Sequence, residues 1–303
     1  MKYHNTKNWL EPLIKFHRAD TFRKLFFFIL FVGLYTFGIT YLETHFNTLV
    51  SSDFIKNIPI MHSLLGFAIS MLLVFRTNTA YDRWWEGRKL WGQLVNNCRN
   101  LAIKLDTYLP VQDKNERLFF KLLLQHFPEN MKSHLQKEKT KFALDSLPHP
   151  EIPDFDVSKH VPAQMVSQLQ KKIHALYKNQ KLDGHQLWLL NGECNSLLDI
   201  TGSCERIKNT PIPYSYSSFI KKFIVIYVLT LPFGFVFTLG YITIPVVMFV
   251  FYVLASLEII AEEIEEPFGT DFNDLPMQRL SEMIKSNIEE IFEMEKINSH
   301  NSQ

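Results

Sequence analysis

Three long apolar segments place the strongest constraint on what this chain can fold into. The segments 25–42 and 58–75 each contain eighteen residues without a charge, and 223–261 contains Glu258 as its only charged residue. A helix rises about 1.5 Å per residue and the hydrocarbon core of a bilayer is about 30 Å thick, so the third segment is long enough for two spans with a turn near Gly240 and Tyr241. The sequence therefore predicts an all-α integral membrane protein with four transmembrane helices, at about 25–42, 58–75, 223–239 and 243–261.

Basic residues flank these segments unevenly, and this predicts their orientation. Lys and Arg precede the first span, follow the second and precede the third, whereas Lys56 is the only such residue between the first two spans. Because cytoplasmic loops carry the excess of Lys and Arg, the basic ends are expected in the cytoplasm. Both termini, the region 76–222 and the tail 262–303 are then cytoplasmic in a multi-pass membrane protein. The polar start of the chain argues against a cleaved signal peptide.

Composition excludes several function classes. The net charge is +1, so the composition shows no excess of basic residues of the kind that binds nucleic acid. The three cysteines form no CxxC pair and have no histidine at zinc-finger spacing, so neither a disulfide framework nor a metal site is expected. No phosphate-binding loop or HExxH motif occurs. We therefore expect no enzymatic activity, no cofactor and no catalytic residues.

The region 76–222 has helical periodicity. Apolar residues from Trp84 to Leu105 recur at steps of seven, three and four, which predicts one long helix leaving the membrane. Further helices are expected at 116–127, 161–179, 184–209 and 277–297, and an exposed loop is expected around Pro148, Pro150 and Pro153.

The second span carries a candidate functional stripe. Ile60, Leu64, Phe67, Met71 and Phe75 follow one another at helical steps, and small or polar residues occupy other faces. Packing against neighbouring helices is the ordinary interpretation. The alternative is a pore constriction formed when several copies surround an axis and gate by dewetting. His62, in the same span, is interpreted as a histidine facing a neighbouring helix or water.

Carboxylates gather after the fourth span. Salt bridges to basic residues such as Arg76, Arg83 or Arg206 are the ordinary interpretation, and an ion path or a cation site is the alternative. The candidates are Glu262, Glu263, Glu265, Glu266, Asp271 and Asp274.

Three motifs carry a family resemblance. FRTNTAYDRWWEGRKLWG (75–92), CERIKNTPIP (204–213) and EEPFG (265–269) resemble the bacterial branch of the bestrophin channels, in the right order relative to the spans. The resemblance implies a homopentamer in the lipid bilayer of the bacterial inner membrane, with a central pore, an apolar neck on the second span and a second restriction within 186–198. The neck would fall on Ile60, Leu64 and either Phe67 or Ala68, with Met71 beyond. The acidic run that forms a calcium clasp in animal bestrophins is interrupted here, which argues against calcium activation.

The predicted function is a passive ion channel for small monovalent ions, with chloride-type anions and sodium-type cations both left open. A secondary transporter is one rival, although little besides His62 and Pro232 hints at a mid-membrane site. A membrane-anchored scaffold is the other.

Overall fold

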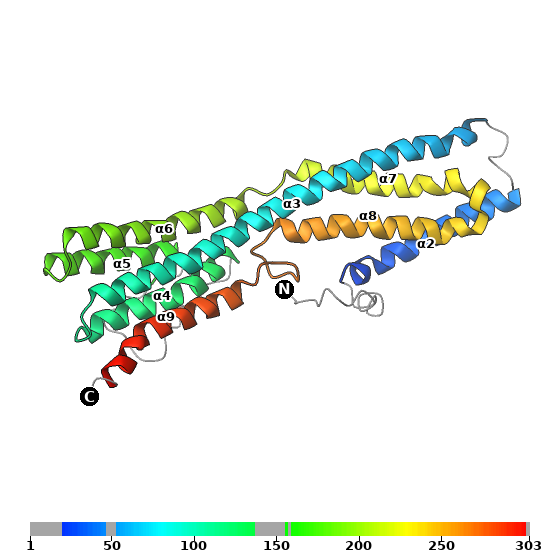
Figure 1. Ribbon diagram of the computed structural model, residues 1–303. Helices are drawn as coiled ribbons and strands as arrows, with labels where there is room; N and C mark the ends of the chain where they lie inside the picture. The colour runs from blue at the N-terminus through cyan, green and yellow to red at the C-terminus, as the bar shows by residue number, and fades with distance from the viewer. Residues whose placement is uncertain (1–19, 47–52, 137–154, 157–158, 301–303) are drawn as a thin grey trace. The chain divides into compact units, whose positions relative to one another are not determined.

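The computed structural model describes residues 20–46, 53–136, 155–156 and 159–300, and every element in these ranges is helical. The predicted loop around Pro148, Pro150 and Pro153, like the chain start before residue 20, lies outside the described residues. The described chain forms two compact units, Lys2–Arg83 with Pro211–Glu266 and Trp84–Thr210 with Pro267–Gln303. Their helices, coloured along the chain in Figure 1, are α2 (Asp20–Phe46), α3 (Asp53–Tyr108), α4 (Lys114–Leu135), α5 (Val161–Lys178), α6 (Gly184–Asn209), α7 (Tyr214–Leu239), η2 (Gly240–Ile242), α8 (Thr243–Glu265) and α9 (Met277–His300).

The first unit contains α2, the first part of α3, α7 and α8. Three helical stretches, Thr21–Phe46, Ile58–Tyr108 and Tyr214–Glu265, are long and apolar enough to cross a membrane by length and composition. The last of these bends at η2, where Gly240 adopts a left-handed φ of +53°, a conformation that glycine tolerates without steric strain. The predicted turn near Gly240 is confirmed, and α7 and α8 form a hairpin that also packs against α2 (Figure 1).

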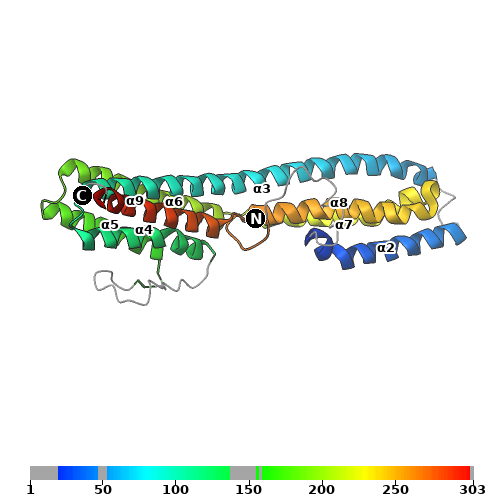
Figure 2. The same cartoon turned by 60° about the horizontal axis from the view of Figure 1, so that its bottom comes forward.

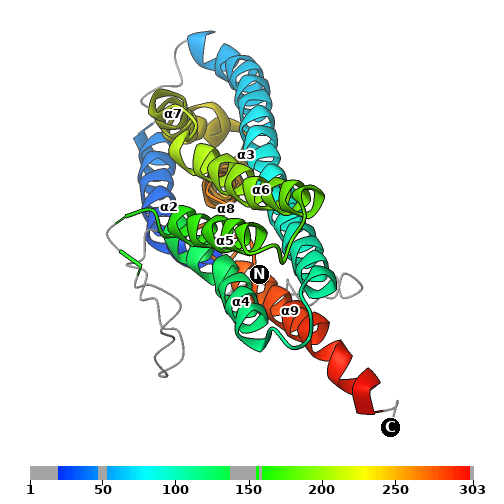
Figure 3. The same cartoon turned by 90° about the vertical axis from the view of Figure 1, so that its left-hand side faces the viewer.

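The second unit packs the remainder of α3 with α4, α5, α6 and α9 (Figure 2). The predicted stripe on α3 is confirmed, because Trp91, Leu94, Cys98, Leu101 and Leu105 are fully buried and Trp84 packs against them. End-on, in Figure 3, α4 and α5 lie side by side with α6 close to α5. Helix α9 places Leu280, Ile284, Ile288 and Ile291 on its buried face, as its amphipathic pattern predicts.

Helix α4 is longer than its sequence predicts. A helix ending at Phe127 was expected, but α4 continues through Pro128 to Leu135. Proline inside a helix costs about 3 kcal/mol because it removes a hydrogen bond and crowds the preceding turn. Here Phe127, Met131 and Leu135, four residues apart, are all buried in the core. Burial of these side chains on one face offsets the cost of the proline.

The three cysteines are buried as free thiols in this unit. Burial is the largest cause that raises the pKa of Cys98, Cys194 and Cys204 to about 12. A raised pKa favours the neutral thiol, so the reactive thiolate is scarce at every pH below that value. We expect none of the three to react with a maleimide at pH 8 in the folded protein, and all three to react after denaturation. Intact-mass measurement counts the adducts, and rapid labelling of any cysteine in the folded protein would contradict the burial.

Candidate functional site

The first part of α3 presents an exposed apolar stripe. Side chains spaced three or four residues apart lie on the same face of a helix, and the stripe predicted from the sequence has this spacing. In the single chain these large side chains are strongly exposed: Ile60 63%, Leu64 69%, Phe67 68%, Met71 44% and Phe75 57%. Ala68 is half-buried beside them. An exposed stripe of five large apolar side chains marks a face that contacts lipid, another protein or a ligand.

The opposite face of α3 packs against α7. Ile69 and Leu73 belong to the same apolar core as Ile224 and Val228 of α7. Gly66 faces Tyr227, whose hydroxyl lies 2.8 Å from where a Cβ at Gly66 would stand, so a larger residue would push the side chain of Tyr227 away. Glycine at position 66 therefore leaves room for the Tyr227 hydroxyl between the two helices.

His62 lies on this packed face. It is 2% exposed, its Nδ1 donates to the carbonyl of Ile58 over 2.9 Å, and its Nε2 lies 3.0 Å from Thr230 Oγ1 on α7. Both ring nitrogens therefore have partners within one packed pair of helices. The interpretation of His62 as a histidine facing a neighbouring helix is confirmed.

Polar groups distinguish the exposed face of α3 from the exposed face of α2. The surface of α2 is covered by large apolar side chains such as Phe27, Phe31 and Leu34. On α3 the exposed Ser63, Ser70 and Thr79 alternate with the large side chains. Each of these hydroxyls donates to the carbonyl four residues earlier, at 2.9, 2.7 and 2.9 Å, which satisfies its donor without water. The α2 surface suits lipid tails, whereas the α3 surface has the mixture of small, polar and apolar groups found where membrane helices meet each other.

Buried charges lie where α3 leaves the stripe. Arg76 is 1% exposed; its guanidinium contacts Glu265 at 2.7 Å and Glu258 at 3.5 Å. The second oxygen of Glu265 accepts from the backbone N–H of Ile212, and the carbonyl of Glu265 accepts from Arg83 Nε. This cluster joins α3 to both ends of the α7–α8 hairpin. The isolated Glu258 in an apolar run was the sequence signal for it, because a charge inside such a run is normally paired.

The other predicted carboxylates are separated rather than gathered into one site. Glu262 pairs with Lys221 at 2.9 Å and Glu263 with Lys24 at 2.7 Å, while Glu266 is exposed. The predicted salt bridge to Arg76 is confirmed for Glu265, whereas Arg83 donates to the backbone carbonyl of Glu265 rather than to its carboxylate. Arg206 contacts Glu86 within its own unit, at 2.9 Å.

Asp271 and Asp274 form a local turn. The carboxylate of Asp274, buried at 3%, accepts from the backbone N–H of Asp271 at 2.5 Å, and the Asp271 side chain is exposed. Neighbouring carbonyls are also engaged: Gly269 accepts from Gln136 and Asn273 from Trp84 Nε1. Calcium requires six to eight oxygen ligands. One Asp274 oxygen and the carbonyls of Gly269 and Asn273 are thus each already engaged in a hydrogen bond within the protein.

Comparison with known proteins identifies the family. The family model for bacterial and fungal bestrophin proteins matches residues 1–290. The chain belongs to the bestrophin family. This confirms the resemblance carried by the three motifs, and it makes the chain a membrane protein.

Individual relatives agree with this assignment. The chain is 36% identical over 262 residues to the voltage-dependent anion channel-forming protein alr2987 of Nostoc sp., covering 81% of this chain and 83% of the relative. It is 32% identical to the voltage-dependent anion channel-forming protein YneE of Escherichia coli, covering 74% and 73%. A crystal structure of a bestrophin homolog from Klebsiella pneumoniae, obtained by Zn-SAD phasing, matches with a TM-score of 0.76 and 27% identity, covering 88% of this chain and 98% of that one.

Proposed function

We propose that this bestrophin-family protein is a passive ion channel of the bacterial cytoplasmic membrane, assembled as a homopentamer around a central pore. The observation that carries the proposal is the apolar stripe on α3, whose large side chains are exposed among the described residues of its unit. Five copies arranged around an axis would bring this stripe together as a ring. The four spans are α2, the first part of α3, α7 and α8, with both termini on the cytoplasmic side.

The stripe would act as the neck of the pore. A narrow apolar ring excludes water when closed and passes partly dehydrated ions when it widens, without covalent chemistry. Ile60 and Leu64 supply two layers of the ring and Met71 lies beyond them. A second restriction is proposed within 186–198 on α6, where Leu190, Cys194 and Leu197 are buried and Trp188 is exposed.

The third layer of the neck is either Phe67 or Ala68. Phe67 is 68% exposed whereas Ala68 is half-buried, which favours Phe67 in the single chain. Ala68→Phe discriminates between them. A phenylalanine that faces the axis would narrow the pore and reduce its conductance, whereas one that faces a neighbouring subunit would leave conductance unchanged or weaken assembly.

We propose that the channel prefers anions. The named function of the Nostoc and Escherichia relatives supports this preference. The pairing of Glu262, Glu263 and Glu265 with basic residues also supports it, because a neutralised carboxylate attracts cations weakly. The positive edge of an aromatic ring at Phe67 would act in the same direction.

The reversal potential of the reconstituted channel in asymmetric NaCl tests both parts of the proposal. An anion channel reverses near the chloride equilibrium potential, and reversal near the sodium potential would assign cations instead. Channel-like unitary currents exclude a secondary transporter, and a purified protein that carries no current would favour a membrane-anchored scaffold. The mass of the detergent-solubilised assembly checks the pentamer; a monomer or dimer as the main species would contradict a central pore.

Calcium is not expected to open this channel. Asp274 is buried within its own turn and Asp271 is a single exposed carboxylate, so the loop offers few oxygens to a hard cation. Current recorded in a calcium chelator is therefore expected to equal current recorded at micromolar calcium. A channel that is silent in the chelator and opens when calcium returns would contradict this. Asp271→Asn would then show whether this loop binds the ion.

A further inference from the structure

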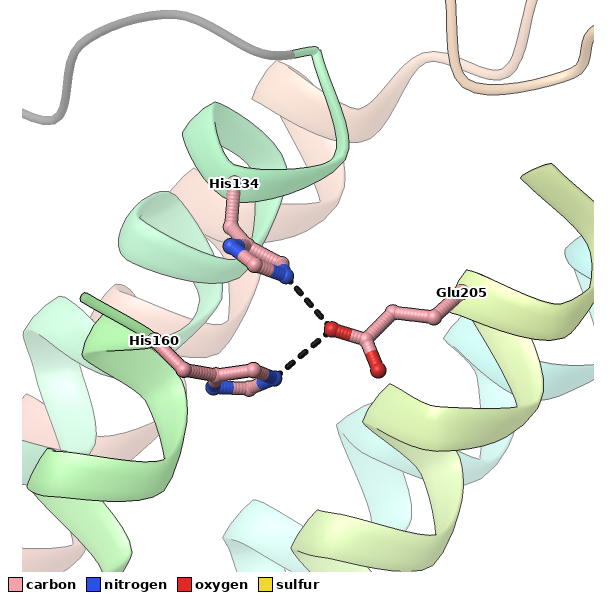
Figure 4. Close-up of side chains that lie close together, drawn as sticks. All are labelled: His134, His160 and Glu205. Atoms are coloured by element: carbon pink, nitrogen blue, oxygen red, sulfur yellow. Dashed lines mark hydrogen bonds and ion pairs between the residues drawn. The ribbon is translucent and has the colours of Figure 1, made fainter. Parts of the chain in front are cut away.

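Two histidines and a glutamate converge on one point in the unit formed by Trp84–Thr210 and Pro267–Gln303. His134 Nε2 lies 2.5 Å and His160 Nε2 lies 2.7 Å from the same carboxylate oxygen of Glu205. Figure 4 shows the two rings approaching this oxygen from different helices, and their centroids are 4.4 Å apart. The three residues are separated by 26 and 45 positions in the sequence, which is why no spacing motif revealed them.

The packing of three helices fixes this arrangement. His134 is in the last turn of α4, His160 is the N-cap of α5, and Glu205 is near the end of α6. Each stands next to a core residue: Leu135, Val161 and Cys204 are at most 2% exposed. The backbone at each position is therefore held by the core, while the three functional side chains remain 27–39% exposed and accessible to an ion from solvent.

The donor set is that of a transition-metal site. Two imidazole nitrogens and one carboxylate, with a fourth position left for water, is a recurrent zinc arrangement. In a tetrahedral site with metal–ligand bonds of about 2.0–2.1 Å, the ligand atoms stand about 3.3 Å from one another. The distances from the two histidine nitrogens to the Glu205 oxygen, 2.5 and 2.7 Å, are shorter than this. An ion that enters between the three groups therefore needs each nitrogen to move away from the oxygen by less than about 1 Å. Side-chain rotation at three partly exposed residues allows this movement.

We propose that His134, His160 and Glu205 form a binding site for a divalent transition-metal ion of the zinc class, which would clamp α4, α5 and α6 together. The proposal is independent of the ion-channel function. It departs from the sequence-based expectation of no metal site, because that expectation rested on cysteine motifs and the ligands here are histidines and a carboxylate.

Two features oppose metal binding and limit its affinity. His160 Nδ1 accepts a hydrogen bond from the Ala163 N–H, so in the neutral ring the proton is on Nε2, the nitrogen that an ion would need. Binding therefore moves this proton to Nδ1 and breaks the cap of α5, which lowers the affinity by about fivefold. In addition, the ammonium group of Lys208 donates to the His134 carbonyl and brings a positive charge near the site.

Titration of the purified protein, carrying no histidine tag, with Zn²⁺ and Co²⁺ tests the proposal. We expect one ion per chain, a cobalt absorption spectrum typical of tetrahedral coordination, and a melting temperature that rises with zinc because only the folded unit binds it. His134→Gln, His160→Asn and Glu205→Gln should each weaken binding at least about 100-fold. Asparagine is chosen at position 160 because its side chain also caps helices, which separates ligand loss from cap loss.

His174→Gln is the matched control, since His174 is an exposed histidine on α5 away from the cluster. It should bind zinc like the wild type. The proposal is overturned if the wild-type protein shows no stoichiometric binding, or if the three variants bind as well as the control. In either case the cluster is a hydrogen-bonded clamp only. The wild-type titration shows whether the protein binds zinc stoichiometrically even if a variant fails to fold.

Discussion

Truncation of Leu64 is expected to raise the single-channel conductance by roughly two- to fivefold. If Leu64 contributes a layer of the neck, five shortened side chains widen the ring at once, and dewetting weakens steeply as radius increases. Phe67→Ala should act in the same direction if Phe67 supplies the third layer. Planar-bilayer recordings of unitary currents, made on protein whose assembly mass has been checked, give the measurement.

Leu34→Ala on α2 is the matched control for Leu64→Ala. Both leucines are strongly exposed in the single chain, Leu34 at 64% and Leu64 at 69%. Leu34, however, lies on the α2 surface, which is covered by large apolar side chains and suits lipid tails. Its truncation should leave both conductance and assembly unchanged. If Leu64 only packs against a neighbouring subunit, its truncation should weaken assembly without any gain in current. Intact assemblies with unchanged conductance in Leu64→Ala and Phe67→Ala would remove the stripe from the pore.

Loss of the Arg76 charge is expected to cause the largest loss of stability. Arg76→Met leaves Glu258 and Glu265 without their shared guanidinium in a buried setting, and breaking a buried ion pair from one side costs about 3–5 kcal/mol. The thermal midpoint of the detergent-solubilised assembly, followed by size-exclusion chromatography, should fall markedly. Wild-type stability in Arg76→Met would show that the buried cluster contributes little.

Arg206→Met provides the contrast with a surface pair. Arg206 and Glu86 contact each other at 2.9 Å with side chains 64% and 44% exposed, so the pair contributes at most about 1 kcal/mol. A second test is rescue. Adding Glu258→Gln and Glu265→Gln to Arg76→Met removes the uncompensated negative charges and should recover part of the lost stability. Absence of any recovery would indicate that the packing of Arg76, rather than its charge, is what stabilises the cluster.

The sequence by itself determined the helical architecture of the described chain. Long apolar runs indicated the membrane segments, and the helical spacing of Leu94, Leu101 and Leu105, which the structure shows to be buried, indicated the long continuation of α3. Gly240 marked the turn between α7 and α8 because few other residues tolerate its backbone conformation. These features depend on neighbours along the chain, so local sequence is sufficient to predict them. The end of α4 was missed because core burial outweighed the local effect of Pro128.

Only the tertiary structure decided which face of α3 is covered and which charged groups meet. Both faces of its first part are apolar, with Ile69 and Leu73 on one side and Leu64 and Phe67 on the other, so periodicity cannot tell the packed face from the exposed one. The pairing of Arg76 with Glu265 and the convergence at Glu205 join residues far apart in sequence. Helical spacing determines which side chains share a face of one helix. Contacts between helices join residues that are far apart in the sequence, so they depend on how all the helices pack together.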